Sequence, residues 1–140
     1  MYESKPLQLR YTGIFVSDVA ATVSFYERAF GLNLHYLHPS GGYAEMDTGA
    51  TLLCFVGEGF IGDTKLLGDR SLHANSRRAP ASGAQIAFVS HNLSADWTRA
   101  LQAGAEVVCA PEAKPWGQPV GYLSDLNGFI VEICTPSPRA

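Results

Sequence analysis

The sequence is poor in charge and cysteine and contains no long hydrophobic run, and each absence excludes a class of protein. Only 16% of the 140 residues are charged and the net charge is −3, so nothing favours nucleic acid or an anionic membrane as partner. No apolar run approaches the roughly 20 residues that span a bilayer, and the N-terminus lacks the apolar stretch of a secretory signal. The three scattered cysteines contain no CxxC pair, which indicates reduced thiols. We therefore expect a cytoplasmic protein.

The first half of the chain has the pattern of one β-α-β-β-β unit. Hydrophobic residues make up 46% of the sequence, which is enough to build the core of one domain over residues 1–140. Residues 11–16 read as a strand, Asp18 can cap a helix, and Gly31 ends that helix. Its apolar face is formed by Val19, Val23, Tyr26 and Phe30. Strands follow at about 32–37, 43–48 and 51–56, separated by turn residues.

The second half repeats this plan. A strand is predicted at 85–89, Asn92 stands where Asp18 stood, and a helix follows that ends at Gly104. Further strands are predicted near 106–109, 119–124 and 129–134. A constant spacing relates Tyr11 to Gln85, and a slightly longer one relates Leu53 to Glu132. Such self-similarity indicates duplication, with module one at about 8–57 and module two at about 84–136.

The crossover between the modules, residues 58–83, carries most of the clustered basic side chains. These are Lys65, Arg70, Arg77 and Arg78. They either receive an anionic group of a substrate or belong to a solvated connection in which charges alternate with Asp63 and Asp69. A connection of this length usually carries function or mobility, or crosses between packed units.

The repeat resembles the vicinal-oxygen-chelate superfamily, which contains glyoxalases, bleomycin-resistance proteins and extradiol dioxygenases. The resemblance runs from Tyr11 to Pro136 and is carried by TGIFVSDVAATVSFYERAFGL in module one and KPWGQPVGYLSDLNGFIVEIC in module two. It implies an α+β fold in which two β-α-β-β-β modules form an open-barrel cleft. It also implies a homodimer, because such modules commonly pair to complete the cleft.

In metal-dependent members of that family, the ligands come from the first and last strands of each module. Carried over to this chain, these positions are Tyr11, Leu53, Gln85 and Glu132, the same residues that the repeat pairs. Glu132 and Gln85 can ligate a divalent Zn, Ni, Fe or Mn ion through oxygen. Tyr11 could do so only as a phenolate, and Leu53 cannot. The resemblance thus implies a degenerate or absent metal site.

Glu132 stands alone in the apolar run of the last strand, and its position poses the main question of the sequence. It lies either on a solvated sheet face or inside the cleft. In the cleft it could act as a general base, with Tyr11 donating a hydrogen bond to a substrate oxygen. His35 is the histidine that we expect at the cleft. Trp116 either stacks on a planar ligand at the cleft mouth or covers the barrel edge.

Two functions agree with these residues. The first is a small-molecule enzyme of lyase or isomerase type, which Glu132 and Gln85 favour. The second is a metal-free protein of the bleomycin-resistance type that sequesters a small, antibiotic-like ligand. Leu53 favours this second function, because it occupies a position where an enzyme would place a ligand.

Overall fold

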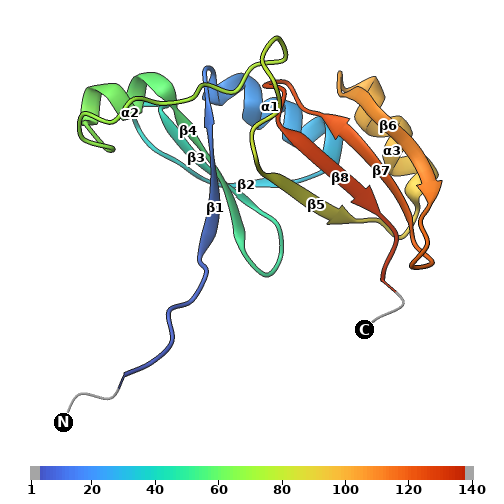
Figure 1. Ribbon diagram of the computed structural model, residues 1–140. Coiled ribbons are helices and arrows are strands. Elements are labelled where there is room, and N and C mark those ends of the chain that lie inside the picture. The colour runs from blue at the N-terminus through green and yellow to red at the C-terminus, as the bar shows by residue number, and fades with distance from the viewer. Residues whose placement is uncertain (1–3, 138–140) are drawn as a thin grey trace.

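The fold consists of two four-stranded sheets, each with its own helix. A computed structural model describes residues 4–137. Module one comprises, in chain order, β1 (Tyr11–Val16), α1 (Val19–Phe30), β2 (Asn33–Leu37), β3 (Tyr43–Asp47) and β4 (Leu52–Gly57). Module two comprises β5 (Gln85–Val89), α3 (Leu93–Gln102), β6 (Glu106–Ala113), β7 (Pro119–Ser124) and β8 (Ile130–Cys134). The α+β class and the two modules are therefore confirmed (Figure 1).

The helix boundaries follow from local chemistry that the sequence displays. Asp18 accepts a hydrogen bond from the Ala21 backbone N–H at 3.0 Å, and Asn92 accepts one from Ala95 at 3.2 Å. Gly31 ends α1 in the left-handed conformation, with φ of 70°, which a residue without Cβ adopts at little cost. The predicted starts and ends of both long helices are confirmed.

The two sheets have the same strand order. Sheet one runs β1-β4-β3-β2 and sheet two runs β5-β8-β7-β6. In each sheet the first and last strands of the module pair in parallel and the other neighbours are antiparallel. The sheets form no closed barrel, and β1 and β5 each occupy a sheet edge.

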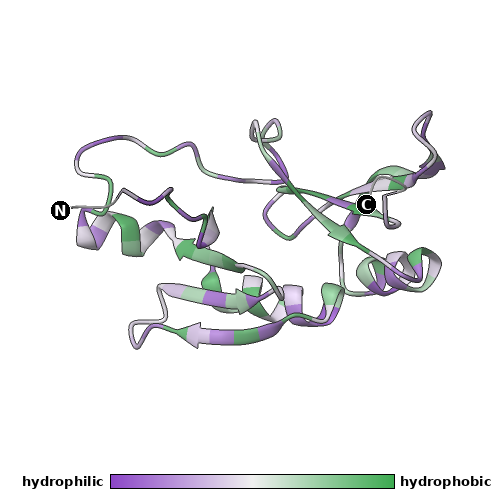
Figure 2. Ribbon diagram, turned by 90° about the horizontal axis from the view of Figure 1, so that it is seen from below, coloured by the Kyte–Doolittle hydropathy of each residue, from purple (hydrophilic) through white to green (hydrophobic). Residues whose placement is uncertain are grey.

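The crossover is more structured than the sequence predicts. It begins with a short helix, α2 (Glu58–Thr64), which contacts β4. The rest of the crossover runs along the molecule from α2 to the second sheet (Figures 1 and 2). Among residues 4–137 there is no helix of the length and apolar character needed to cross a membrane.

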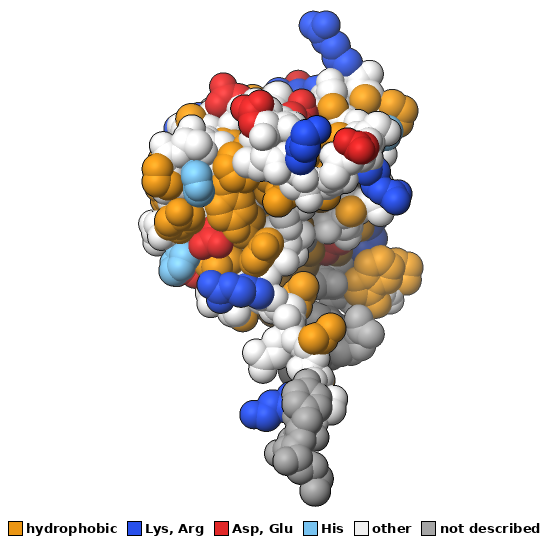
Figure 3. Space-filling model, turned by 90° about the vertical axis from the view of Figure 1, so that its left-hand side faces the viewer, with side chains coloured by type: hydrophobic (Ala, Val, Ile, Leu, Met, Phe, Trp, Pro, Cys, Tyr) orange, Lys and Arg blue, Asp and Glu red, His pale blue; other side chains and the backbone are white. Residues whose placement is uncertain are grey.

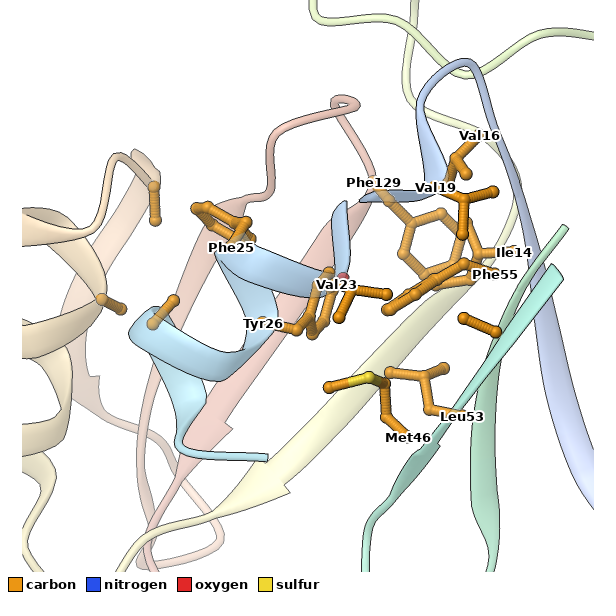
Figure 4. Packing of buried hydrophobic residues seen from close by; sticks show 14 of the residues in the cluster. Ile14, Val16, Val19, Val23, Phe25, Tyr26, Met46, Leu53, Phe55 and Phe129 are labelled. Atoms are coloured by element: carbon orange, nitrogen blue, oxygen red, sulfur yellow. The ribbon is translucent and has the colours of Figure 1, made fainter. Parts of the chain in front are cut away.

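One continuous core joins the two modules. Helix α1 packs on β3 and β4 of its own module and also against α3 of module two. Phe129 of module two lies beside Ile14 and Phe55 of module one (Figure 4). Such mixed packing means that neither module buries its apolar surface alone, so the relative placement of the modules is set by the core.

A buried polar network fixes the same contact. The Tyr26 hydroxyl of α1 donates to Oδ2 of Asp125 at 2.6 Å, and Asn127 Nδ2 donates to Thr22 Oγ1 at 3.1 Å. Asp125 and Asn127 belong to the turn between β7 and β8, so α1 is bonded directly to module two. Arg77 of the crossover adds a bond from its Nε to the Asp125 carbonyl oxygen at 2.8 Å.

Candidate functional site

Sheet one presents Leu53 to the core and not to an open surface. The register pairs Thr12 with Leu53 and Gly13 with Cys54, so Leu53 and Cys54 project to opposite faces. Leu53 is 4% exposed and belongs to the hydrophobic core, on the side covered by α1. The prediction that Leu53 shares a cleft with Glu132 is therefore wrong.

The wrong prediction for Leu53 comes from aligning β4 with β8 one residue out of register. Tyr11 is paired with Leu52, and its counterpart Gln85 is paired with Ile130, so the counterpart of Glu132 is Cys54. A shift of one residue moves a strand side chain to the other face of the sheet. The repeat identified the correct strands, but the spacing that it suggested for the last strands was one residue too long.

We define the open face of sheet one as the face opposite α1, which carries Tyr11, Tyr43, Glu45 and Cys54. The Tyr43 hydroxyl donates to Glu45 Oε2 at 2.8 Å and lies 3.3 Å from Cys54 Sγ. Partial burial is the main cause that raises the pKa of Tyr43 far above its usual value, and burial also raises the pKa of Cys54. Both groups are therefore neutral near pH 7. The Tyr43-x-Glu45 alternation was the sequence signal for this group, and the sequence analysis missed it.

We define the open face of sheet two as the face opposite α3, which carries Gln85, Tyr122, Glu132 and Cys134. Gln85 Nε2 donates to Glu132 Oε1 at 3.2 Å, so the structure brings these two predicted residues together. Partial burial raises the pKa of Tyr122, and the neighbouring charge of Glu132 raises it further. The same two causes, burial first, raise the pKa of Cys134. Glu132 is thus an acceptor held among protonated neighbours and is partly exposed.

One chain does not bring Tyr11 and Glu132 into a common cleft. A cavity of about 430 Å³ lies between the sheets, and its walls include Thr12 and Leu53 of sheet one and Phe88 of sheet two. The cavity also borders Leu52 and Ala87, the register partners of Tyr11 and Glu132, but neither Tyr11 nor Glu132 is among its lining residues. The reason is α1, which bonds the helix-covered sides of the two modules to each other and leaves each open face directed outward.

The donors of a single chain do not fit a resident divalent cation. Gln85 and Glu132 supply two donors, and the Gln85 amide nitrogen is turned toward the carboxylate. Catalytic zinc sites generally use about three protein ligands. Within residues 4–137 there is no group of three or more His, Cys, Asp or Glu side chains placed to hold a metal. The other two positions that the resemblance carried over, Tyr11 and Leu53, lie on the other sheet, on opposite faces.

The remaining candidates have separate places. Trp116 is 53% exposed in the loop between β6 and β7, where its Nε1 donates to Gln118 Oε1 at 2.9 Å. His35 lies on β2 and borders a second cavity, of about 390 Å³, at the edge of the open face of sheet one. Figure 3 shows histidine and acidic side chains among hydrophobic ones on that side of the molecule.

The basic side chains of the crossover do not form one anion site. Arg77 donates to the carbonyl oxygens of Asp125 and Gly104 and pairs with Glu106 at 3.1 Å. Arg77 therefore anchors the crossover to module two. Lys65 lies 4.0 Å from Asp69, and both side chains are exposed. This pair agrees with the solvated alternative for the crossover.

Comparisons with known proteins identify the family of the chain and structures with the same fold. The model of the Glyoxalase/Bleomycin resistance protein/Dioxygenase superfamily matches residues 8–133. The structure is similar to a glyoxalase-related enzyme from Fulvimarina pelagi, with a TM-score of 0.74 at 18% identity over 92% of this chain and 88% of that one. It is also similar to a glyoxalase/bleomycin resistance protein/dioxygenase family enzyme from Burkholderia phytofirmans PsJN, with a TM-score of 0.69 at 19% identity, covering 89% and 95% of the two chains.

A third similar structure is TioX from Micromonospora sp. ML1, with a TM-score of 0.68 at 22% identity, covering 91% of this chain and 98% of that one. At these identities the likeness establishes the fold. No curated protein matches the sequence of this chain.

Proposed function

Because the chain belongs to the Glyoxalase/Bleomycin resistance protein/Dioxygenase superfamily, we propose that it is an enzyme of lyase or isomerase type in which Glu132 accepts a proton from a small oxygenated substrate. The observation that carries this proposal is the Gln85–Glu132 hydrogen bond on the open face of an otherwise apolar strand. The bond orients the carboxylate, which also interacts with the Tyr122 hydroxyl and the Cys134 thiol.

Glu132 acts as the general base in this proposal. Positioned proton transfer typically contributes a factor of about 10² to 10⁴ to a rate. Tyr122 stays protonated near neutral pH, because burial, the charge of Glu132 and a hydrogen bond to Glu132 raise its pKa. Its hydroxyl can donate to a substrate oxygen beside the base by exchanging the bond to Glu132 for one to the substrate. A lyase or isomerase step that begins with loss of a proton next to a carbonyl group needs these two functions.

A second copy of the chain completes the site in this proposal. Strands β1 and β5 are edge strands, and an unpaired edge offers a row of backbone donors and acceptors to another chain. Tyr11 on β1 is 45% exposed and Val89 on β5 is 58% exposed, so association would cover apolar surface on both edges. When β1 of one copy adjoins β5 of the other, Tyr11 comes to the side of Glu132 and donates to the substrate.

The proton-transfer role can be tested without knowing the natural substrate. Small carbonyl compounds are incubated with the protein in D₂O, and exchange of the proton next to the carbonyl group is followed by ¹H NMR. Wild type is expected to accelerate exchange for at least one compound, and Glu132→Gln to lower that rate by about 10² or more. Glu27→Gln, a change on the exposed surface of α1, is the control. Equal rates for wild type and Glu132→Gln would reject the proposed base.

The shared site has its own test. Native mass spectrometry and light scattering are expected to give a homodimer, and Val89→Glu to shift it toward monomer, because a charge would then lie at the β5 edge. Val107→Glu on β6 is the matched control, since Val107 is 52% exposed and far from that edge in strand order. A monomeric wild type at assay concentration would contradict the completed site.

A binding protein that sequesters a small, antibiotic-like ligand without metal is the second candidate. It is favoured by the exposed aromatic rings of Tyr11, Tyr36 and Trp116, which are 45%, 44% and 53% exposed and offer flat apolar surface. Tight uptake of a planar compound that persists in Glu132→Gln, with no turnover in wild type, would support this function over catalysis.

A further inference from the structure

The second cavity, at the end of the open face of sheet one, has the lining of a binding pocket for a charged group. Its volume is about 390 Å³, within the range of roughly 300–1,000 Å³ that is typical of small-molecule sites. Its charged and ionisable lining residues are Arg10, just before β1, His35 on β2 and Asp47 at the end of β3. The turn between β3 and β4 supplies much of the remaining wall. Three separate elements thus converge on one pocket.

Arg10 is a cation without a protein counter-ion here. It takes part in no ion pair with another residue of the range 4–137. Asp47 lines the same pocket but forms no ion pair with Arg10 within 4.0 Å, and its Oδ1 accepts the Gly49 backbone N–H at 2.9 Å. The charge of Arg10 acts on Cys54 of the open face, where it opposes the burial that raises the pKa of that thiol. The positive charge of Arg10 therefore contributes to the electrostatic potential at this face.

We propose that this pocket binds the carboxylate of a small molecule whose planar body lies on the open face of sheet one. Arg10 presents a flat fork of donors that matches the two oxygens of a carboxylate, and His35 adds a ring N–H. The inference rests on the proposed function in one respect, that the open faces are the surfaces that meet the small molecule. It adds the chemical class of that molecule.

The surrounding charges favour a carboxylate over a phosphate. Glu45 and Asp47 lie on the same face of sheet one as the pocket, since both are on β3 two residues apart. Their repulsion grows in proportion to the charge of the ligand, so it is about twice as large for a dianion as for a monoanion. A monoanion therefore gains the contact to Arg10 with less repulsion than a dianion.

Two aromatic rings farther along the open face of sheet one account for the planar body. Tyr36 and Tyr43 have ring centroids 6.3 Å apart at an interplanar angle of 56°, and Tyr36 is 44% exposed. The register pairs Tyr36 with Glu45, so this ring stands on the open face. In Figure 3 hydrophobic side chains cover this part of the surface, with a basic side chain at their lower margin. An aromatic acid can rest on these rings while its carboxylate reaches Arg10.

The test uses benzoate, its neutral isostere benzamide, and phenyl phosphate as probes, with binding to the full chain measured by calorimetry and NMR titration. Wild type is expected to bind benzoate at least about tenfold more tightly than benzamide, which is the scale of one charge-assisted contact. Arg10→Met is expected to remove this preference and to leave benzamide binding unchanged. Arg70→Met, an exposed arginine of the crossover, is the matched control and should bind like wild type.

Several outcomes would overturn the inference. These are absence of benzoate binding, equal binding of benzoate and benzamide, and an equal loss in Arg10→Met and Arg70→Met. Tighter binding of phenyl phosphate than of benzoate would overturn the carboxylate assignment. Circular dichroism checks that Arg10→Met is folded, and His35→Asn, expected to weaken benzoate only severalfold, provides a second variant. Binding that depends on Arg10 while Glu132→Gln leaves proton exchange unchanged would keep this inference and reject the proposed catalysis.

Discussion

Replacing Tyr26 by Phe removes one hydroxyl from the centre of the contact between the modules. The hydroxyl donates to Asp125 Oδ2 at 2.6 Å, and both residues are 0% exposed. The other carboxylate oxygen, Oδ1, accepts the backbone N–H groups of Asn127 and Phe129 at 2.8 Å each. Tyr26→Phe therefore leaves Oδ2 buried without this donor, while the apolar ring contacts remain.

The expected cost follows from the burial of a charged acceptor. An unsatisfied buried polar group costs about 1–3 kcal/mol and a charged one more, so we expect the free energy of unfolding to fall by about 3 kcal/mol at pH 7. For a chain of this size that corresponds to a loss of roughly 10 °C in Tm. Tyr36→Phe, at a ring that is 44% exposed, is the control and should change stability by less than about 0.5 kcal/mol.

The loss should depend on pH. Burial raises the pKa of Asp125 above its usual value, and the hydrogen bond from Tyr26 is the largest effect that opposes this rise. Because the folded pKa lies above the unfolded one, protonation of Asp125 favours folding, and stability is lost as pH rises through the folded pKa. Tyr26→Phe raises the folded pKa further, so its cost is largest at neutral pH and shrinks as Asp125 becomes protonated on acidification.

Urea unfolding of both variants at pH 7 and at about pH 4.5, close to the ordinary range of carboxyl groups, measures this dependence. A Tyr26→Phe cost that matches the control would refute the importance of the bond. A cost that is the same at both pH values would refute the assignment of that cost to the Asp125 charge.

Three further variants test the contact between the crossover and module two, the register of β4 and the open face of sheet two. Gly128→Ala should destabilise by more than about 2 kcal/mol in thermal unfolding, because φ is +82° and a Cβ would lie 2.5 Å from a backbone oxygen of the crossover. Gly49→Ala, in the turn between β3 and β4, where φ is +102° and the space is open, should cost only about 1 kcal/mol, and equal losses would contradict the close approach. Leu53→Ala should lower the free energy of unfolding by about 3 kcal/mol in chemical denaturation, as for a core leucine. A loss below about 1 kcal/mol would contradict the burial of this side chain in the core. Glu132→Gln should lower the pKa of Tyr122 toward its usual value, which ¹³C NMR of labelled tyrosine measures. An unchanged pKa would contradict the electrostatic interaction between Glu132 and Tyr122.

Much of the fold was predictable, because short-range chemistry sets its elements. Strand alternation, the caps Asp18 and Asn92 and the left-handed Gly31 act over a few residues, so the sequence alone determined both modules and their helix ends. It also determined that Gln85 and Glu132 meet, because equivalent strands of a repeat pair in the same way.

The composition of the site was decided only by tertiary structure. A one-residue change of register, which no local pattern reveals, gave the open face to Cys54 and sent Leu53 into the core. The direction of the open faces depends on contacts such as that between Tyr26 and Asp125, which are 99 residues apart in the chain. Periodicity specifies which side of a strand is apolar, but which partner covers that side is set by packing between distant segments.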